Sequence, residues 1–221
     1  MPFSTSKEFF FVRISKTAGM YLMRALNDSI EDLVDAEKNY FPPMQLNGVN
    51  HGDHFWLRDI QDGLMRDPEK FNKHGLTLEK FERFKKFGIV RNPYSRILSF
   101  LSFTKRDSIK DYTPEMFKRD VMNLGTGVKS YHLRQTDFLF AENGDCLADK
   151  VFKLEDPNLI QSIEQYLCLE IERYLPTQKV NATSNRNYSI QEYYSDKIIQ
   201  DRVYEFFELE FNSFGYEYEL S

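Results

Sequence analysis

The feature that most restricts the fold is a repeated change from short apolar runs to segments with helical spacing. Residues 9–14 (FFFVRI) and 84–90 (FKKFGIV) are rich in β-forming residues and have the length of buried strands, and residues 150–154 (KVFKL) form a third run. Each run is followed by apolar residues at three- or four-residue intervals, which indicates a helix face. Such faces are formed by Leu22, Leu26 and Ile30, by Ile97, Leu98 and Leu101, and by Ile160, Ile163, Leu167, Ile171 and Leu175. Strands that alternate with helices indicate βαβ units, so the sequence predicts an α/β fold with a mainly parallel central sheet flanked by helices.

Length and composition fit one globular domain. The chain has 221 residues, of which 41% are hydrophobic and 15% aromatic, so it can bury a sizeable core. It contains no internal repeat, no low-complexity tract and no Pro- or Gly-rich linker, and we therefore expect a single domain over residues 1–221. The net charge of −5 argues against nucleic acid as a partner, because nucleic-acid binders usually carry a basic excess.

The cysteines and the apolar runs bear on the compartment. Cys146 and Cys168 form neither a CxxC pair nor a metal-binding spacing, so we expect free thiols in a reducing compartment. No apolar run reaches the length of a membrane span, and residues 9–12 are too short for the apolar core of a secretion signal. The sequence therefore predicts a soluble, cytoplasmic protein without a transmembrane segment, and it does not indicate the oligomeric state.

Three further segments complete the expected secondary structure. Residues 36–75 are expected to be irregular, with turn signals at Pro42-Pro43, Asn47-Gly48 and Asp62-Gly63. Asn92 is a suitable N-cap and Pro93 suits the first position of the helix that follows residues 84–90. Apolar residues at helical spacing over residues 190–207 predict a helix near the end of the chain. Its aromatic residues are expected to pack into the core rather than to form a platform for a sugar.

The first strand-to-helix turn has the composition of an anion site. It holds Lys16, Thr17 and Gly19, and it lies at the carboxyl end of a predicted parallel strand, where ligands bind in open α/β sheets. The first N–H groups of the following helix lack partners within the helix, and the helix dipole is positive there. The turn is not a Walker A loop, because the lysine precedes the glycine. The alternative interpretation is a solvated loop lysine beside a packing glycine.

The second strand-to-helix turn repeats this composition. Arg91 ends the strand over residues 84–90 and offers a planar fork of donors to a phosphate group, and Ser99 follows eight residues later on the predicted helix. Two anion-suited turns on neighbouring strands indicate one ligand with two separated anionic groups.

Several segments of the chain resemble a known enzyme family in the same order. The segment RISKTAGMYLMRAL is similar to the 5′-phosphosulfate loop of sulfotransferases, and FGIVRNPYSRILSFLSF is similar to their 3′-phosphate motif. The similarity continues through LRQTDFLF, VFKLEDPN and YYSDKIIQDRVYEFFELEFNSFGYEYEL. The chain thus resembles the carbohydrate sulfotransferases that include the heparan and uronyl 2-O-sulfotransferases and bacterial sulfotransferase family 2 proteins. This resemblance implies a P-loop-like α/β fold, the donor PAPS (3′-phosphoadenosine 5′-phosphosulfate), an acceptor hydroxyl group, most often of a saccharide, and no obligatory metal.

The resemblance also implies roles for residues of the two turns. Lys16 would contact the oxygen that bridges phosphate and sulfate, while Thr17, Ala18 and Gly19 would hold the 5′-phosphate, largely through backbone N–H groups. Met20 completes this donor-binding loop at a position where relatives usually carry a hydroxyl group, so one donor to the 5′ side is missing here.

The 3′-phosphate motif carries two of the implied contacts. Arg91 and Ser99 would bind the 3′-phosphate of the donor.

A base is also needed, because sulfuryl transfer to an alcohol requires removal of the hydroxyl proton. The segment HGDHFWL supplies two candidates, His51 and His54, with Asp53 between them as a group that could orient either ring. The family implies a histidine followed by an apolar residue, which favours His54 and leaves His51 as the rival or as a contact to the acceptor. His74 and His132 are interpreted as structural or surface residues. No metal site is expected, because the HGDH residues lack a helical i, i+4 arrangement and no further ligand set is evident.

Two polar residues and two other functions stay open at this point. Gln135 and Glu155 lie in segments that resemble the family. We expect them either to contact the acceptor or to stabilise loops. The alternatives to a sulfotransferase are a small-molecule kinase on a related fold and a catalytically weakened nucleotide-binding protein. A kinase needs a Walker A loop and a magnesium-binding carboxylate on the second strand, and the sequence shows neither.

Overall fold

The computed structural model describes residues 1–35, 45–46, 49–50, 56–73, 75–105, 110–126, 134–176 and 186–220. The chain divides into two compact units, which we describe separately. Unit 1 comprises Met1–Val90 and Gln135–Val180, and unit 2 comprises Arg91–Arg134 and Asn181–Ser221. The expectation of a single domain stays a prediction.

Unit 1 contains the sheet. Its strands among the described residues are β1 (Pro2–Ser4), β2 (Phe9–Val12), β3 (Val34–Asp35), β6 (Lys85–Val90) and β7 (Lys150–Lys153). They lie in the order β3-β1-β2-β6-β7. β2, β6 and β7 are parallel neighbours, whereas β1 runs antiparallel to both β2 and β3. The three strands predicted from the sequence therefore form the parallel part of the sheet, and the mainly parallel α/β fold is confirmed.

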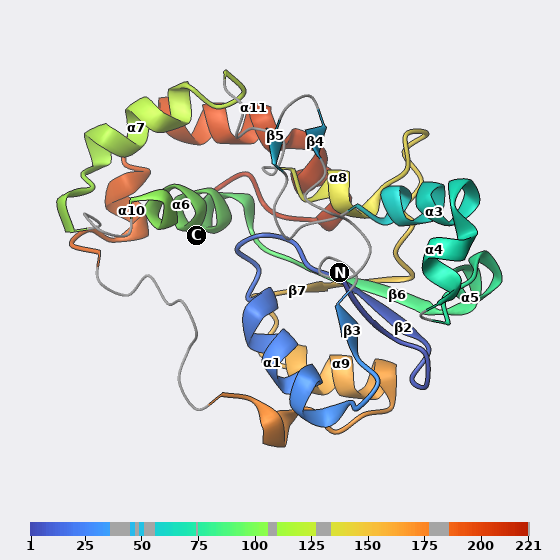
Figure 1. The fold of residues 1–221 in the computed structure, drawn as a ribbon. Coiled ribbons are helices and arrows are strands. Elements are labelled where there is room, and N and C mark those ends of the chain that lie inside the picture. Colours follow the sequence, from blue (N-terminus) through green and yellow to red (C-terminus); the bar gives the residue numbers. More distant parts are fainter. Residues whose placement is uncertain are drawn as a thin grey trace. The chain divides into compact units, whose positions relative to one another are not determined.

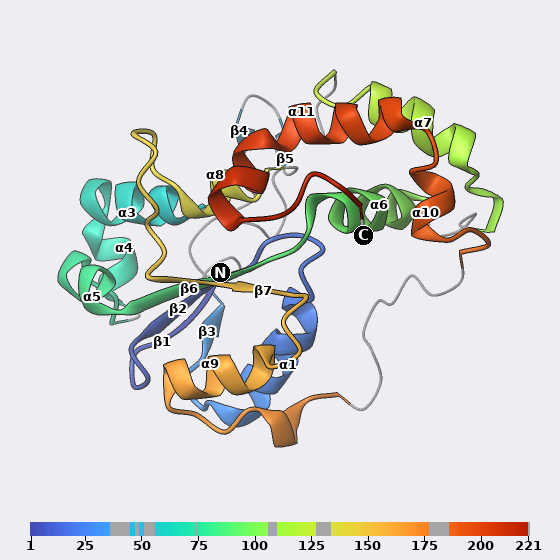
Figure 2. The same cartoon turned by 180° about the vertical axis from the view of Figure 1, so that it is seen from behind.

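Helices cover the sheet of unit 1. They are α1 (Gly19–Ser29), α3 (Leu57–Arg66), α4 (Pro68–Asn72), α5 (Leu78–Arg83), α8 (Thr136–Leu139) and α9 (Leu159–Leu167), with a 3₁₀ turn at Glu172–Tyr174. The alternation of β2 sets the two faces. Phe9 and Phe11 pack with the apolar faces of α1 and α9, which lie side by side (Figures 1 and 2), while Phe10 packs against Phe81 and Phe84.

The structure corrects three expectations in unit 1. Residues 36–75 are not irregular throughout, because α3 and α4 lie within them, as do the short antiparallel strands β4 (Gln45–Leu46) and β5 (Val49–Asn50). Asp62-Gly63 lies inside α3 instead of forming a turn, since burial of Leu57, Ile60 and Leu64 on one face holds the helix together. The helix expected to continue to Leu175 ends at Leu167, where Cys168 takes a left-handed conformation.

Unit 2 consists of α6 (Pro93–Thr104), α7 (Pro114–Met122), α10 (Ile190–Tyr193) and α11 (Lys197–Phe214) among the described residues. Asn92 caps α6 as predicted, because its side chain accepts a hydrogen bond from the Tyr94 N–H at 3.0 Å. The helix predicted over residues 190–207 is instead two helices. Apolar residues at helical spacing continue from α10 into α11. The chain nevertheless begins a new helix, because the Asp196 side chain accepts a hydrogen bond from the Ile198 N–H and caps α11.

Aromatic side chains form the core of unit 2. Tyr193 and Tyr194 are buried, and their hydroxyl groups donate to the carbonyl oxygens of Tyr112 (2.6 Å) and Tyr94 (2.7 Å). The Phe117 ring lies 5.3 and 5.0 Å from the two tyrosine rings. These contacts confirm that the aromatic residues near the end of the chain serve core packing, and they fasten the start of α6 to α10.

Candidate functional site

The first candidate feature is the turn between β2 and α1 in unit 1. Lys16 and Ala18 adopt left-handed backbone conformations there, with φ values of 67° and 60°. Such conformations cost free energy in residues with a Cβ atom, and they cluster at ligand-binding positions. Turns with left-handed residues direct successive N–H groups toward one concave side, which suits an anion. The half-buried Lys16 adds a positive charge to this turn.

α1 begins at this turn without a side-chain cap. Ala18 occupies the N-cap position, and it makes no side-chain cap hydrogen bond to the first turn. Within the described part of the chain, the N–H groups of Gly19 and Met20 donate to no backbone acceptor. These N–H groups and the positive end of the helix dipole are therefore the donors that an anion would use.

The side chains of the turn shape it from the protein side. Thr17 is fully buried, and its Oγ1 donates to the carbonyl oxygen of Ile14 at 2.9 Å, so its contribution to anion binding falls to the backbone N–H. A Cβ atom on Gly19 would lie 3.5 Å from Arg13 Cγ, at ordinary van der Waals distance. Met20, at the position where the family usually has a hydroxyl group, is 43% exposed.

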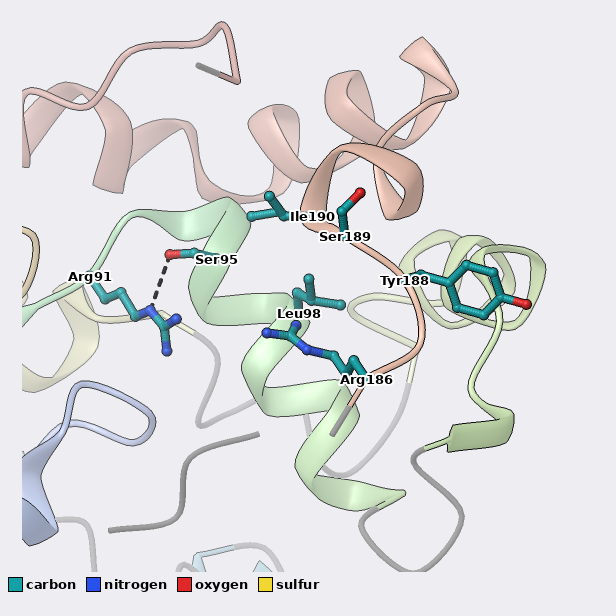
Figure 3. A pocket seen from close by; sticks show the side chains of 7 residues that line it. All are labelled: Arg91, Ser95, Leu98, Arg186, Tyr188, Ser189 and Ile190. Carbon is teal, nitrogen blue, oxygen red and sulfur yellow. Dashed lines mark hydrogen bonds between the residues drawn. The ribbon is translucent and has the colours of Figure 1, made fainter. Parts of the chain in front are cut away.

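The second candidate feature is a cavity of about 360 Å³ in unit 2 (Figure 3). Arg91 enters it from the residue before the α6 cap, and Arg186 enters it from the segment that leads into α10. The complete lining among the described residues is Arg91, Ser95, Leu98, Arg186, Tyr188, Ser189 and Ile190. This lining holds two guanidinium groups and no carboxylate, so the cavity is suited to an anion.

Ser95 holds the Arg91 guanidinium in place. Arg91 Nε donates to Ser95 Oγ at 3.1 Å, and Ser95 Oγ in turn donates to the carbonyl oxygen of Asn92 at 3.2 Å. Because Nε is engaged with the serine, the orientation of the planar guanidinium is fixed relative to the start of α6. The expected partner Ser99 lies one helical turn after Ser95, is buried, and is not among the residues that line this cavity.

Arg186 and Ser95 were not expected from the sequence. Arg186 lies 95 positions after Arg91 in a polar segment without periodicity, and only the fold brings the two arginines to one cavity. Ser95 lies one helical turn after Arg91, and this i, i+4 spacing next to the N-cap was a usable signal for a contact between the two side chains.

None of the four histidines is among the described residues. His51 and His54, the candidate bases, are outside the described residues, as are Asp53, His74 and His132. The described residues include no group of three or more His, Cys, Asp or Glu side chains arranged to hold a metal ion.

The open residues Gln135 and Glu155 differ in environment. Gln135 is fully buried in unit 1, whereas Glu155 is exposed. Cys146 and Cys168 are free, exposed thiols, as expected. In the part of the chain that the structure describes, no helix combines the length and the apolar composition that a membrane crossing needs.

Comparison with known proteins places these features in a family. No curated protein and no solved structure matches the chain. A family model described as "Sulfotransferase family" matches residues 2–217, which include both the Lys16 turn and the two-arginine cavity. The chain therefore belongs to the sulfotransferase family, and the reaction class is sulfuryl transfer.

Proposed function

We propose that this sulfotransferase takes the sulfuryl group from PAPS and transfers it to a hydroxyl group of a saccharide. The observation that carries the donor assignment is the cavity of unit 2, in which Ser95 orients the Arg91 guanidinium and a second arginine contributes charge. A nucleotide with a 3′-phosphate supplies the anion that such a cavity suits. The uncapped turn at Lys16 is the matching feature for the phosphosulfate end of the donor.

The residues present fit this donor. Arg186 Nη1 is buried and has no hydrogen-bond partner among the described residues, which is the state expected of a donor whose natural acceptor is a ligand. Arg91 would bind the 3′-phosphate, with its guanidinium group held in orientation by Ser95. A contact from Ser99 to the same phosphate stays a prediction. The N–H groups of Thr17, Gly19 and Met20 would hold the 5′-phosphate.

Lys16 and a histidine would support the chemical step. The acceptor oxygen forms a new bond to sulfur, the bond from sulfur to the 5′-phosphate oxygen breaks, and the hydroxyl proton passes to a base. Lys16 would neutralise the charge that develops on the departing phosphate oxygen. We propose His54 as the base, with His51 as a contact to the acceptor.

The donor assignment is tested by calorimetry with purified full-length protein. 3′-Phosphoadenosine 5′-phosphate (PAP) should bind at least about tenfold more tightly than adenosine 5′-phosphate, because the 3′-phosphate makes charge-assisted hydrogen bonds. ATP with magnesium, the ligand of the kinase alternative, should bind weakly. Equal affinity for PAP and adenosine 5′-phosphate would contradict the assignment.

The variant Arg91→Lys refines this measurement. Lysine keeps the charge but lacks the planar fork and cannot donate to Ser95 in the same way. The preference for PAP should therefore fall, while the affinity for adenosine 5′-phosphate should change little.

The base assignment is tested by two alanine variants. His54→Ala should lower kcat by about 10²–10⁴, the usual range for general-base catalysis, with little change in PAP affinity. His51→Ala should raise the acceptor KM more than it lowers kcat. If only the His51→Ala variant loses the acidic limb of the pH–rate profile, the two roles are reversed. If both variants keep full activity, the base lies outside this segment.

A further inference from the structure

The chain of unit 2 turns back on itself after α11. Gly215 ends this helix in a left-handed conformation with φ of 59°, and the Tyr216 N–H donates to the carbonyl oxygen of Phe211 at 3.0 Å. The segment Gly215–Leu220, which we call the strap, then lies against both α11 and α6 (Figures 1 and 2). Tyr216 and Leu220 of the strap pack against the aromatic core of unit 2.

The Tyr218 side chain fastens the strap to α11. Its hydroxyl group donates to the Asp201 carboxylate, and the Lys197 Nζ atom lies 3.9 Å from the centre of its ring. The Tyr204 ring makes an edge-to-face contact with the Tyr218 ring, with 4.9 Å between the ring centres. Lys197, Asp201 and Tyr204 are spaced i, i+4 and i+7 on α11, so one face of this helix holds the tyrosine of the strap.

The strap also contacts α6 through its backbone. The Tyr94 hydroxyl group donates to the carbonyl oxygen of Tyr218 at 2.7 Å, whereas the carbonyl oxygen of Gln200 is 3.5 Å away. Burial raises the pKa of Tyr94, so this hydroxyl group stays protonated and acts as a donor. The residue that is held by α11 through its side chain therefore supplies the closer acceptor for the first turn of α6.

Tyr94 lies among the residues that set the geometry at the start of α6. The Asn92 side chain accepts from the Tyr94 N–H at 3.0 Å, and the Tyr94 carbonyl oxygen accepts from Tyr194 at 2.7 Å. The carbonyl oxygen of Asn92 accepts from Ser95 Oγ, which in turn accepts from Arg91 Nε. A displacement of Tyr94 would therefore reach the Arg91 guanidinium group through neighbouring hydrogen bonds.

We propose that the strap positions the start of α6, and that Tyr218 is a positioning residue that acts on donor binding through Tyr94. This proposal rests on the proposed function, because it takes Arg91 as the group that meets the 3′-phosphate. With the strap in place, Tyr94 keeps its close acceptor, and Arg91 is held in orientation before the donor arrives. Without the strap, Tyr94 is left with the more distant Gln200 oxygen or with water, and the free protein adopts further orientations of Arg91 that bind the phosphate less well.

The test is a double-mutant cycle on the full-length protein. Tyr218→Ala removes the side chain that fastens the strap, Tyr94→Phe removes the hydroxyl group that donates to the strap, and a third variant combines the two changes. The affinities for PAP and for adenosine 5′-phosphate are measured by calorimetry well below the unfolding temperature. Glu217→Gln changes an exposed glutamate of the strap and is the matched control.

Both single variants should lose affinity for PAP but not for adenosine 5′-phosphate, which lacks the 3′-phosphate. We expect each loss to be about three- to tenfold, the effect of one hydrogen bond. The combined variant should lose no more than the larger single loss, because both changes interrupt the same contact. Tyr218→Phe keeps the ring contacts with Lys197 and Tyr204 and should lose less affinity than Tyr218→Ala. Glu217→Gln should bind both nucleotides as the wild type does.

The outcomes separate this proposal from the proposed function. If the wild type binds PAP no better than adenosine 5′-phosphate, the donor assignment fails and the strap proposal with it. If the wild type prefers PAP and Tyr218→Ala keeps that preference, even with a lower unfolding temperature, the strap serves stability alone and only the strap proposal is overturned. Losses that add in the combined variant would also overturn it, because the strap would then not act through Tyr94. If Tyr218→Ala does not fold, the cycle is run with Tyr218→Phe, and the same outcomes decide.

Discussion

At the scale of single residues, left-handed backbone conformations occur in two different settings next to helices α1 and α9. Lys16 and Ala18 lie within the candidate phosphosulfate turn, where a concave set of N–H groups explains their conformation. Cys168, with φ of 55°, lies at the end of α9, where a left-handed residue simply terminates a helix. Under the proposed function the first conformation serves donor binding, whereas the second has no proposed ligand, so a change at Cys168 should leave activity intact.

Replacement of Cys168 by glycine should stabilise the protein. Glycine adopts the left-handed conformation without the Cβ penalty, so the free energy of unfolding should rise by about 1 kcal/mol in urea titrations. Cys168→Ala is the matched control, since it removes the thiol but keeps the Cβ atom, and it should give no such gain. A gain of equal size in both variants would attribute the effect to the thiol rather than to the backbone.

Replacement of Lys16 by alanine should separate catalysis from binding. If the lysine stabilises charge on the leaving group, kcat should fall by a larger factor than the affinity for PAPS, because the bridging oxygen of the intact donor does not yet carry that charge. Lys73→Ala, a change at an exposed lysine after α4, serves as the control and should leave both quantities unchanged. Unchanged turnover of folded Lys16→Ala protein would exclude this role.

At the scale of elements, one carboxylate fastens the edge of the sheet in unit 1. Asp32, between α1 and β3, accepts hydrogen bonds from Ser4 Oγ (2.6 Å), Thr5 Oγ1 (3.0 Å), Ser6 N (2.8 Å) and Ser6 Oγ (2.8 Å). Burial alone would raise the pKa of Asp32, but these hydrogen bonds outweigh it and lower the pKa from 3.8 to about 2. The ionised carboxylate thus ties the turn between β1 and β2 to the segment before β3.

The hydrogen bonds to the Asp32 carboxylate predict that the stability of the protein depends on pH. Because the folded pKa lies below the unfolded one, the contribution of Asp32 is complete above the unfolded value and is lost as the pH falls toward about 2. Asp32→Asn should therefore be less stable than the wild type at about pH 5, and the difference should narrow on acidification. The exposed Asp28→Asn is the control. A difference that stays constant with pH would show that the carboxylate charge is not the stabilising group.

The sequence predicted those elements whose signal is local. β2, β6 and β7 were found because each is a run of β-formers, and the start of α6 was found because Asn92 and Pro93 form a recognisable cap. β1 and β3 were not found, because strands of three and two residues leave no periodicity. The break between α10 and α11 was missed because apolar spacing runs across it, and only the Asp196 cap marks it.

The candidate site was predictable to a similar degree. The Lys16 turn and Arg91 follow strands in the sequence, so both could be found from their neighbours. The place of Arg186 in the cavity could not be found from the sequence, because Arg186 comes from a distant polar segment in which no sequence pattern marks it. The direction of the Thr17 hydroxyl, toward Ile14 in the turn, also depends on the folded backbone.

At the scale of the whole molecule, the two units carry complementary parts of one proposed function. Unit 1 holds the uncapped Lys16 turn on the parallel sheet, and unit 2 holds the arginine cavity on a helical core. The match to the sulfotransferase family runs through both units, over residues 2–217. We therefore expect that neither unit suffices alone for turnover of the donor.

The most direct test of this account follows labelled sulfate from PAPS into separate pools of oligosaccharides, phenols and lipids. The account predicts that PAP is formed and that label enters the oligosaccharide pool, with both signals strongly reduced in Lys16→Ala and in Arg91→Lys. Label in phenols or lipids but not in oligosaccharides would contradict the saccharide acceptor. Tight binding of PAP without transfer to any pool would contradict the enzyme itself and would favour a protein that only binds the nucleotide.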